Sequence, residues 1–268
     1  MSSLPLIAFI GGGNMAVAIL GGLRRQGVPA SQFVVVEPGA PQRDKLAADL
    51  GIEARPQADA ALSDAALVVW AVKPQLFTEA AAPCAPYVGQ ALQLSIMAGI
   101  RSESVAAASG SPRVVRAMPN TPALVGKGVA GLFASEGVTA QERAQVETVL
   151  APTGRLLWVD QESDLDAVTA LSGSGPAYVF YFLEAMVQAG EEMGLSTQQS
   201  RQLAQETFEG AAALAQQSEE ALHILRERVT SKGGTTHAAI TSLQDSGVKE
   251  AFVRALHAAR LRAQALGR

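Results

Sequence analysis

The first residues able to do chemistry form a glycine-rich turn near the start of the chain. Gly11, Gly13 and Ala16 occupy the three small positions of a G-x-G-x-x-A pattern between a short apolar run and an apolar helical stretch. Gly11 permits a tight turn, Gly13 lets a pyrophosphate approach the backbone, and Ala16 lets the helix pack close to the strand. The helix N-terminus offers unpaired N–H groups to phosphates. This context predicts a bound nicotinamide dinucleotide rather than an ordinary turn.

An acidic residue after the second predicted strand bears on the choice of dinucleotide. Glu37 stands where a carboxylate can bind the ribose 2′-hydroxyl and repel a 2′-phosphate, which favours NADH. Arg43 is near enough in sequence to assist a phosphate, which favours NADPH. The residues therefore leave both NADH and NADPH open as cofactors.

Three further segments follow predicted strands. Pro74 ends its strand and leaves Lys73 at the rim, where the ammonium either reaches a ribose or phosphate or is an ordinary solvated charge. Ala98 and Gly99 let a flat nicotinamide ring approach the backbone, although turn geometry alone also explains Gly99. The amide of Asn120, between two prolines, is able to meet the nicotinamide or a structural carbonyl.

Hydroxyl side chains gather just before a predicted helix, in the segment Thr230-Ser231-Lys232-Gly233-Gly234-Thr235-Thr236. Hydroxyls and flexible glycines at a helix N-terminus form a cradle for a carboxylate. As the plain alternative, Thr235 or Thr236 caps the helix, and a capped start can still bind an anion. His237 beside this loop is a weaker candidate. The histidines lack metal-ligand spacing and have no cysteine partner, so no metal site is expected.

The elements that must position these residues change type along the chain. From residue 6 to about 158, short apolar runs alternate with helical patterns, which predicts an α/β fold with a parallel sheet covered on both faces. Ligands then lie beyond the carboxyl ends of the strands. From Asp164 onward only helical patterns continue, so we expect two domains, residues 1–160 and an all-α domain of residues 161–268. The predicted strands are Leu6–Ile10, Phe33–Glu37, Ala66–Ala71, Leu92–Ile96, Arg113–Ala117, Val129–Phe133 and Leu156–Val159.

The helical half contains an unusually apolar run. Tyr178–Leu183 is apolar around nearly its whole circumference, which predicts a helix buried on every side. A partner subunit is the expected cover, with a central helix of a monomer as the alternative. The preceding Ser172–Pro176 segment predicts a helix start with Ser174 as N-cap.

Composition limits the remaining classes. A chain of 268 residues with 48% hydrophobic composition can bury a sizeable core. The net charge of −4 argues against a nucleic-acid partner, which needs a basic surplus. The single cysteine, Cys84, fits a reducing compartment, and no apolar run suits a signal peptide or a bilayer span. We therefore expect a cytoplasmic protein without a membrane or nucleic-acid partner.

With these residues assembled, the chain closely resembles the pyrroline-5-carboxylate reductase family over essentially its whole length. The resemblance rests on five segments in the family's order: Ile10–Ala16, Ala71–Pro74, Arg116–Ala123, Ser172–Tyr178 and Gly233–Thr236. It implies a Rossmann domain and a helical domain that interlocks with a second subunit in a homodimer, often within a ring of dimers. It also implies NAD(P)H-dependent reduction of the C=N bond of 1-pyrroline-5-carboxylate to L-proline, the last step of proline synthesis.

By position, the resemblance assigns residues to a cofactor site and a substrate site. It also implies NADPH as the cofactor, because members of the family more often use NADPH than NADH. The resemblance implies that Ser231, Gly234, Thr235 and Thr236 bind the substrate's carboxylate and ring nitrogen. Thr236 and Ser231 are the catalytic candidates, since either hydroxyl could hydrogen-bond the nitrogen as it becomes an amine. Where many relatives place an Asn near the adenosine, this chain has Gln57 and Ala58. Together with the residue-based candidates, the expected cofactor set is Phe9, Ile10, Gly11, Gly12, Gly13, Asn14, Met15, Glu37, Ala71, Val72, Lys73, Pro74, Ala98, Gly99 and Asn120.

Two other functions compete with this reading. A β-hydroxyacid dehydrogenase shares the cofactor domain but relies on an interdomain lysine as proton carrier, and no lysine lies between Lys127 and Lys232. A sensor that binds the cofactor without turnover is the rival from another class, because one fold hosts many functions. The hydroxyl loop argues against the sensor.

Overall fold

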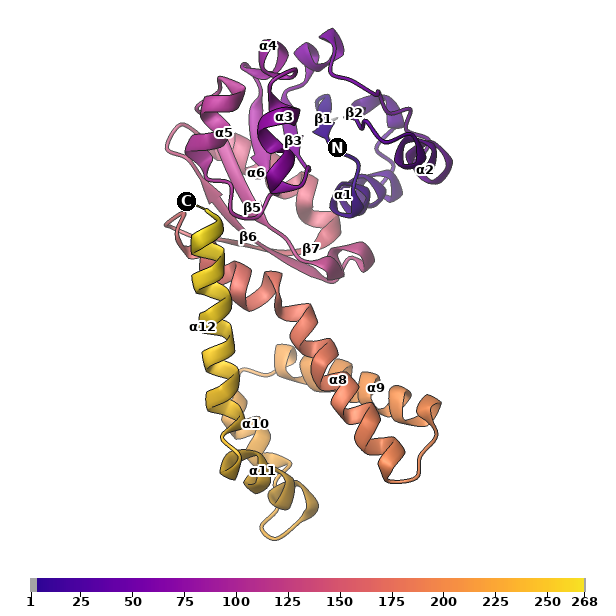
Figure 1. The fold of residues 1–268 in the computed structure, drawn as a ribbon, viewed down its shortest axis with the longest axis vertical. Helices are drawn as coiled ribbons and strands as arrows, with labels where there is room; N and C mark the ends of the chain where they lie inside the picture. Colours follow the sequence, from indigo (N-terminus) through magenta and orange to yellow (C-terminus); the bar gives the residue numbers. More distant parts are fainter. Residues whose placement is uncertain (1–3, 268) are drawn as a thin grey trace. The chain divides into compact units, whose positions relative to one another are not determined.

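A seven-stranded sheet forms the centre of the amino-terminal part of the computed structural model, which describes residues 4–267 (Figure 1). The strands lie in the order β2-β1-β3-β4-β5-β6-β7. All seven predicted strands are present, with ends shifted by at most two residues. Their bounds are β1 (Ile7–Ile10), β2 (Phe33–Val36), β3 (Leu67–Trp70), β4 (Leu92–Ser95), β5 (Val114–Met118), β6 (Gly128–Ala134) and β7 (Gly154–Trp158).

The sheet departs from the expected parallel arrangement at one strand pair. β1 to β5 are parallel, but β6 runs antiparallel to β5, with Arg116 opposite Phe133. β7 is again parallel to β6. Only residues 119–127 join β5 to β6, and they contain the short 3₁₀ helix η4 (Thr121–Val125). A parallel return needs a crossover of roughly a dozen residues or more, so this short connection reverses the strand.

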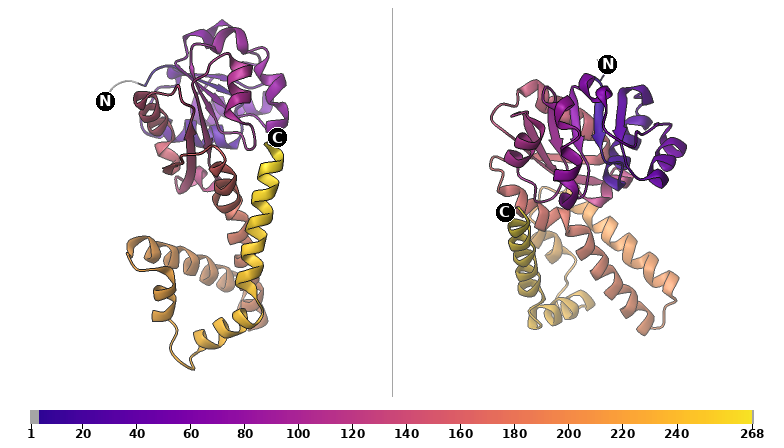
Figure 2. Two further views of the ribbon diagram at one scale, coloured as in Figure 1. Left: turned by 90° about the vertical axis from the view of Figure 1, so that its left-hand side faces the viewer. Right: turned by 45° about the horizontal axis from the view of Figure 1, so that its top comes forward.

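Both faces of the sheet are covered, as the apolar strands predict (Figures 1 and 2). Successive strand residues enter two separate apolar cores, as Phe9 and Ile10 do. α1 (Asn14–Arg25), α2 (Ala40–Leu50) and α6 (Ala140–Leu150) pack on one core, and α3 (Phe77–Ala81), α4 (Ala85–Val88) and α5 (Ser102–Ser109) pack on the other. The short helices of this part are η1 (Ala30–Gln32), η2 (Ala60–Asp64), η3 (Pro74–Leu76) and η5 (Ala151–Thr153).

The strand order places a topological switch at β1. The chain passes from β1 to β2 on one side and returns to β3 on the other side of β1. Crevices at such switch points, beyond the carboxyl ends of the strands, are where doubly wound sheets bind ligands. The glycine turn directly follows β1 and therefore lies at this crevice.

The chain divides into two compact units, one comprising the residues up to Ser174 with 259–267 and the other Gly175–Ala258. The first unit also holds α7 (Asp164–Val168) and a π-helical turn, η6 (Thr169–Gly173). The second holds α8 (Gly175–Glu192), α9 (Thr197–Gln217), α10 (Leu222–Arg228), α11 (Thr235–Asp245) and most of α12 (Val248–Leu266). The domain limits at residue 160 stay a prediction.

Ser174 is not the N-cap that the sequence predicts. Its dihedrals are helical (φ −84°, ψ −16°), whereas an N-cap residue is extended. Its N–H donates to the carbonyl oxygen of Thr169 at 2.8 Å, so the backbone continues from η6 to α8 without a capping residue. The Ser172–Pro176 segment predicts a new helix start, but a π-helical turn occupies this place and joins the helices on either side.

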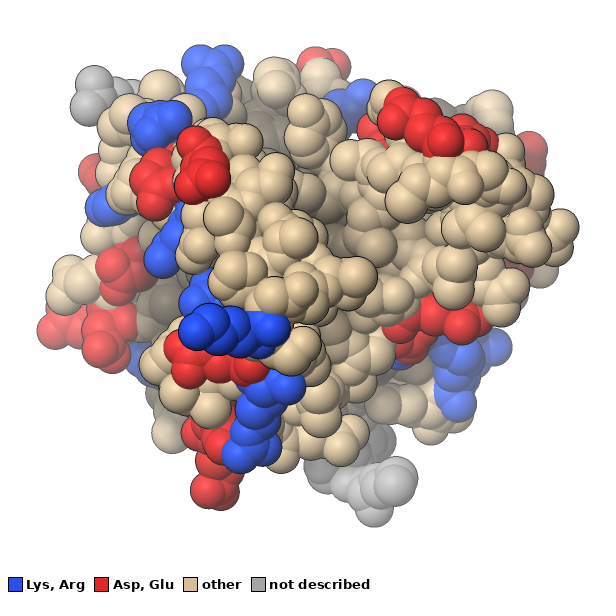
Figure 3. Space-filling view, turned by 90° about the horizontal axis from the view of Figure 1, so that it is seen from below, with Lys and Arg blue, Asp and Glu red and all other residues tan. Residues whose placement is uncertain are grey.

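The aromatic run on α8 is only partly buried within one chain. Tyr178 and Phe182 pack edge-on against Phe252 of α12, with ring centroids 5.7 and 5.6 Å apart. Phe180 and Tyr181 remain 58% and 70% exposed. The predicted burial on every side is therefore not achieved by the chain alone. In the view of Figure 3, residues other than Lys, Arg, Asp and Glu make up most of the visible surface.

Within residues 4–267, no helix combines the length and the hydropathy that crossing a bilayer requires.

Candidate active site

The glycine turn has the geometry that a dinucleotide site needs. Gly11 has φ +97°, and a Cβ there would lie 2.7 Å from the carbonyl oxygen of Ala71, so neither the backbone nor the space admits a side chain. Gly13 has ordinary extended dihedrals, and a Cβ there would meet no atom within 4 Å. The turn thus packs closely against Ala71, the residue after β3, at Gly11 and is exposed to solvent at Gly13. A ligand phosphate fits in this open space.

The start of α1 suits an anion. Gly13 is its N-cap, no side chain caps it, and no acidic residue occupies its first turn. The first N–H groups of a helix have no intrahelical acceptor, and the helix dipole favours negative charge there. Asn14 is exposed and Met15 half-buried in this turn. The first turn can therefore hold a pyrophosphate.

Glu37 is tied to the glycine turn. Its Oε2 accepts a hydrogen bond from the N–H of Gly12 at 2.8 Å, and its Oε1 accepts one from the N–H of Gly39 at 2.8 Å. Arg43 donates from Nη1 to the carbonyl oxygens of Glu37 and Pro38 at 3.0 and 2.7 Å. Glu37 therefore follows β2 directly, the guanidinium of Arg43 reaches the same place from α2, and each side chain already has partners.

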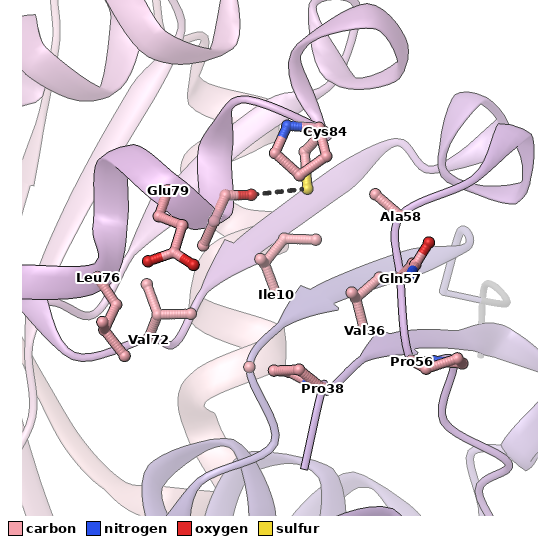
Figure 4. A pocket seen from close by; sticks show the side chains of 13 residues that line it. Ile10, Val36, Pro38, Pro56, Gln57, Ala58, Val72, Leu76, Glu79 and Cys84 are labelled. Atoms are coloured by element: carbon pink, nitrogen blue, oxygen red, sulfur yellow. Dashed lines mark hydrogen bonds between the residues drawn. The ribbon is translucent and has the colours of Figure 1, made fainter.

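Beside the turn lies an apolar cavity of about 420 Å³ (Figure 4). Its walls come from the ends of β1, β2 and β3 and from the segments that follow them, a place and size that suit an adenosine moiety. Sequence reasoning found few of these residues, because most carry no polar group. They are Ile10, Gly11, Val36, Pro38, Pro56, Gln57, Ala58, Val72, Leu76, Glu79, Ala80, Pro83 and Cys84.

The thiol of Cys84 is unreactive in this cavity wall. It is 1% exposed and donates from Sγ to the carbonyl oxygen of Ala80 at 3.2 Å (Figure 4). Burial raises the pKa of the thiol to about 11. At neutral pH the group is therefore protonated and acts as an apolar filler.

The segments after β3 and β4 line the same edge of the sheet. Ala71 contacts the glycine turn and Val72 lines the cavity, while Lys73 is exposed and Pro74 begins η3. Ala98 and Gly99 form the turn after β4, with Gly99 at φ +78°. Phe9, in contrast, is fully buried in the core, so its side chain supports the strand.

The amide of Asn120 meets a structural carbonyl, one of the two roles that the sequence allows. Its Nδ2 donates to the carbonyl oxygen of Ser172 at 3.1 Å, and its Oδ1 accepts from the N–H of Val129 at 2.9 Å. The residue is only 9% exposed. The amide therefore ties β6 to the π-helical turn, and a contact with the cofactor stays a prediction.

The hydroxyl loop lies in the second unit, between α10 and α11. Gly234, not a threonine, is the N-cap of α11, and no side chain caps it, so the simple capping alternative for Thr235 and Thr236 is wrong. Both threonines belong to the first turn, where Thr236 is half-buried and Thr235 exposed. A Cβ on Gly234 would lie 2.6 Å from Oγ of Ser231, so this hydroxyl packs against the helix start. Hydroxyls and free N–H groups together suit a carboxylate.

A polar cluster near the turn after β4 was missed by sequence reasoning. The carboxylate of Glu162 accepts from the N–H and the Oγ of Ser102 at 2.6 and 2.9 Å. Asp166 pairs with Arg101 at 2.9 Å. These contacts hold the loop that follows Gly99 against the segment that leads into α7. The partners lie about sixty residues apart, so no local pattern announces them.

Comparisons with known proteins match both parts of the chain. The family model described as pyrroline-5-carboxylate reductase dimerisation matches residues 162–266, and the one described as NADP oxidoreductase coenzyme F420-dependent matches residues 6–99. A pyrroline-5-carboxylate reductase from Pseudomonas aeruginosa is 47% identical over 266 residues, which covers 98% of this chain and 97% of that protein. The chain belongs to the pyrroline-5-carboxylate reductase family.

Solved structures of pyrroline-5-carboxylate reductases have the same architecture. The enzyme from Coxiella burnetii is 35% identical with a TM-score of 0.91, and each chain covers 99% of the other. The pyrroline carboxylate reductase of Plasmodium falciparum, solved with NADP bound, is 26% identical with a TM-score of 0.89 over 99% of both chains. The resemblance of the five motifs to this family is thus confirmed.

Proposed function

We propose that the protein is a pyrroline-5-carboxylate reductase, an NAD(P)H-dependent oxidoreductase that reduces 1-pyrroline-5-carboxylate to L-proline in the last step of proline synthesis. The observation that carries this proposal is the 47% identity along 98% of the chain to a protein of that name. It is supported by a glycine turn whose open position, Gly13, leaves room for a phosphate.

The first unit holds the cofactor in this proposal. The N–H groups at the start of α1 bind the pyrophosphate, and the apolar cavity takes the adenosine. Lys73, exposed at the rim, approaches a ribose or phosphate, and Ala98 with Gly99 leaves room for the nicotinamide. Bound NAD(P)H supplies the hydride for the C=N carbon. The cofactor domain spans residues 1–160 and the helical substrate domain residues 161–268.

The hydroxyl loop holds the substrate. The Thr235 and Thr236 hydroxyls and the start of α11 bind the carboxylate, and Thr236 or Ser231 hydrogen-bonds the ring nitrogen. A protonated imine becomes a neutral amine when its carbon gains a hydride, so no separate acid is needed at that moment. The residues then contribute orientation and exclusion of water, which suits a loop without a titratable dyad.

The assembly is a homodimer, and a ring of dimers is our finer proposal. Phe180 and Tyr181 on α8 are large side chains that remain exposed in one chain, and a partner subunit would bury them. The match to the dimerisation model spans this helix. We place the enzyme in the cytoplasm, where the buried, unpaired Cys84 fits a reducing compartment.

An absorbance assay of NAD(P)H consumption separates the three candidate functions. We expect rapid oxidation of NAD(P)H that depends on 1-pyrroline-5-carboxylate, with L-proline as the product. Reduction of NAD⁺ by a β-hydroxyacid would instead identify a dehydrogenase. Cofactor binding without turnover of either substrate would identify a sensor. Either of these outcomes overturns the proposal.

A further inference from the structure

The turn after β4, residues 96–101, is held only at its ends by its own backbone. Within the part of the chain that the structure describes, residues 98–100 make no backbone hydrogen bond. The neighbouring backbone bonds are one from the N–H of Ile96 to β3 and one from α5 to the carbonyl oxygen of Arg101, each 3.1 Å long. Between these two points, the shape of the turn depends on what packs against it.

The end of α12 packs against this turn. From residue 259 on, the helix belongs to the first unit. A Cβ on Gly99, whose φ is +78°, would lie 3.0 Å from the carbonyl oxygen of Leu266. A Cβ on Gly267 would lie 3.0 Å from the carbonyl oxygen of Gly99. The glycine at position 99 is therefore required by its own backbone conformation and by the close approach of α12.

Arg101 links the end of α12 to α7. Its Nη2 donates to Oδ2 of Asp166 at 2.9 Å, and the side chain of Asp166 is 5% exposed. A Cβ on Gly267 would lie 2.9 Å from Nε of Arg101, so the guanidinium also lies against the residue that follows α12. The last carbonyl groups of a helix have no intrahelical donor and carry partial negative charge, which favours a cation there. One guanidinium thus joins the turn to two helices.

We propose that Arg101 and the end of α12 position the nicotinamide for hydride transfer by holding the turn after β4 in place. The inference rests on the proposed function, in which Ala98 and Gly99 leave room for the nicotinamide. Arg101 is a positioning residue, because it acts through the turn and not on the substrate. The pyrophosphate and the adenosine bind at other segments in that proposal. Loss of the support should therefore change the placement of the ring and leave the affinity for the cofactor intact.

The first test is the kinetics of R101Q in the full-length protein. Glutamine keeps a polar side chain but removes the charge that pairs with Asp166. We expect kcat for reduction of 1-pyrroline-5-carboxylate to fall by about tenfold to a hundredfold, because a small misplacement of reacting groups is costly. The KM for the imine and the Kd for the cofactor should stay within about threefold of the wild type. R101K keeps the charge and should recover most of the rate.

Single-turnover measurements separate misplacement from partial unfolding. A partly unfolded preparation would oxidise less NADPH in the first turnover, but with the wild-type rate constant. A misplaced nicotinamide gives the full amplitude with a lower rate constant, which is the result we expect for R101Q. R155Q, which changes an exposed arginine on β7, is the matched control and should keep the wild-type rate constant.

G267V tests the contact of α12 independently. The valine side chain either displaces the Gly99 carbonyl oxygen and the Arg101 guanidinium or detaches the end of α12, and both remove the support. We expect the single-turnover rate constant to fall by about tenfold or more, with the cofactor affinity retained. A265V places the same side chain at an exposed position of the same helix turn and should behave as the wild type.

A wild-type rate constant in R101Q or in G267V overturns the inference. Thermal unfolding accompanies each variant, and G267V decides the question if R101Q does not fold.

Failure of the proposed function gives a different result, namely a wild type that does not reduce the imine. The fluorescence lifetime of bound NADPH then tests the inference, because it needs no imine. A loosely held nicotinamide ring moves more freely, so R101Q and G267V should shorten this lifetime toward that of free NADPH at an unchanged Kd. Wild-type lifetimes in both variants would overturn the inference.

Discussion

Arg116 on β5 donates from Nη1 to Oε1 of Glu162 across 2.9 Å, and this ion pair joins the sheet to the segment before α7. Arg116 is only 4% exposed. Because Glu162 also accepts both hydrogen bonds from Ser102, one carboxylate anchors the loop after Gly99 and a buried guanidinium. The position of the predicted nicotinamide-facing turn therefore depends on a residue outside it.

Replacing Glu162 should reveal this dependence in the pH profile of stability. Burial raises the pKa of Glu162, but the hydrogen bonds from Ser102 and Arg116 lower it by more, so the pKa lies below its ordinary value. Its stabilising contribution is complete above the ordinary pKa of about 4.3 and is lost as the pH falls through the folded-state pKa. E162Q should lower the free energy of unfolding at neutral pH by roughly 1–3 kcal/mol and flatten the acid dependence.

Urea unfolding between neutral and acidic pH measures both effects. D160N, which changes an exposed carboxylate nearby, should stay within about 0.5 kcal/mol of the wild type. An E162Q protein as stable and as acid-sensitive as the wild type would contradict the role of this carboxylate.

Two glycines of the same turn should respond differently to alanine. G11A places a Cβ 2.7 Å from the Ala71 carbonyl oxygen at φ +97°, and we expect a loss of stability of about 1–3 kcal/mol or more. G13A has ordinary dihedrals and meets no atom within 4 Å, so its stability should match the wild type. Its methyl group nevertheless stands where a phosphate approaches, and the Kd for NAD(P)H should rise about tenfold or more.

Thermal unfolding and fluorescence titration of both variants distinguish these effects. Wild-type cofactor affinity in a stable G13A protein would mean that the pyrophosphate binds elsewhere.

Thr236 tests the substrate half of the site. T236V is nearly isosteric and removes one hydroxyl, and a lost buried hydrogen bond costs about 1–3 kcal/mol. We expect a matching fall in kcat/KM for the imine with the Kd for the cofactor nearly unchanged. T241V, on the exposed side of the same helix, should have wild-type kinetics. Equal kinetics of T236V and T241V would remove Thr236 from the mechanism.

If a partner subunit buries the exposed aromatic residues of α8, a charge introduced among them should prevent dimer formation. F180E places a carboxylate on a side chain that is 58% exposed in one chain and that we expect a partner subunit to bury. Sedimentation should show loss of the dimer at micromolar concentration. Q141E, at an exposed position on α6, should remain dimeric. A wild type that is already monomeric would contradict the proposed assembly.

The sequence was sufficient to predict the parts of the fold that depend on local patterns. Short apolar runs placed all seven strands, and the Gly11–Ala16 spacing placed the glycine turn directly after the first strand. The strand order, which makes this position a switch point, came from the structure. The antiparallel β6 was not predicted, because its direction depends on the length of a connection and not on strand composition.

The site was less predictable where distant residues meet. The hydrogen bonds from Gly12 to Glu37 and from Ser102 to Glu162 join residues that lie far apart in the sequence. Ser174 has the residue type of an N-cap, yet the π-helical turn before it carries the helix through. The Tyr178–Leu183 run predicted a fully buried helix, yet Phe180 remains 58% exposed in one chain. The sequence predicts that a partner subunit covers this run, but it does not show which residues of the run that partner would cover.

The central claim is direct transfer of hydride from the nicotinamide to the imine carbon of 1-pyrroline-5-carboxylate. The most direct test uses reduced cofactor deuterated at the transferring position of the nicotinamide, with the proline product analysed by mass spectrometry and NMR. We predict L-proline that carries one deuterium on the ring carbon formerly double-bonded to nitrogen. Proline without deuterium, or no proline at all, would contradict this account.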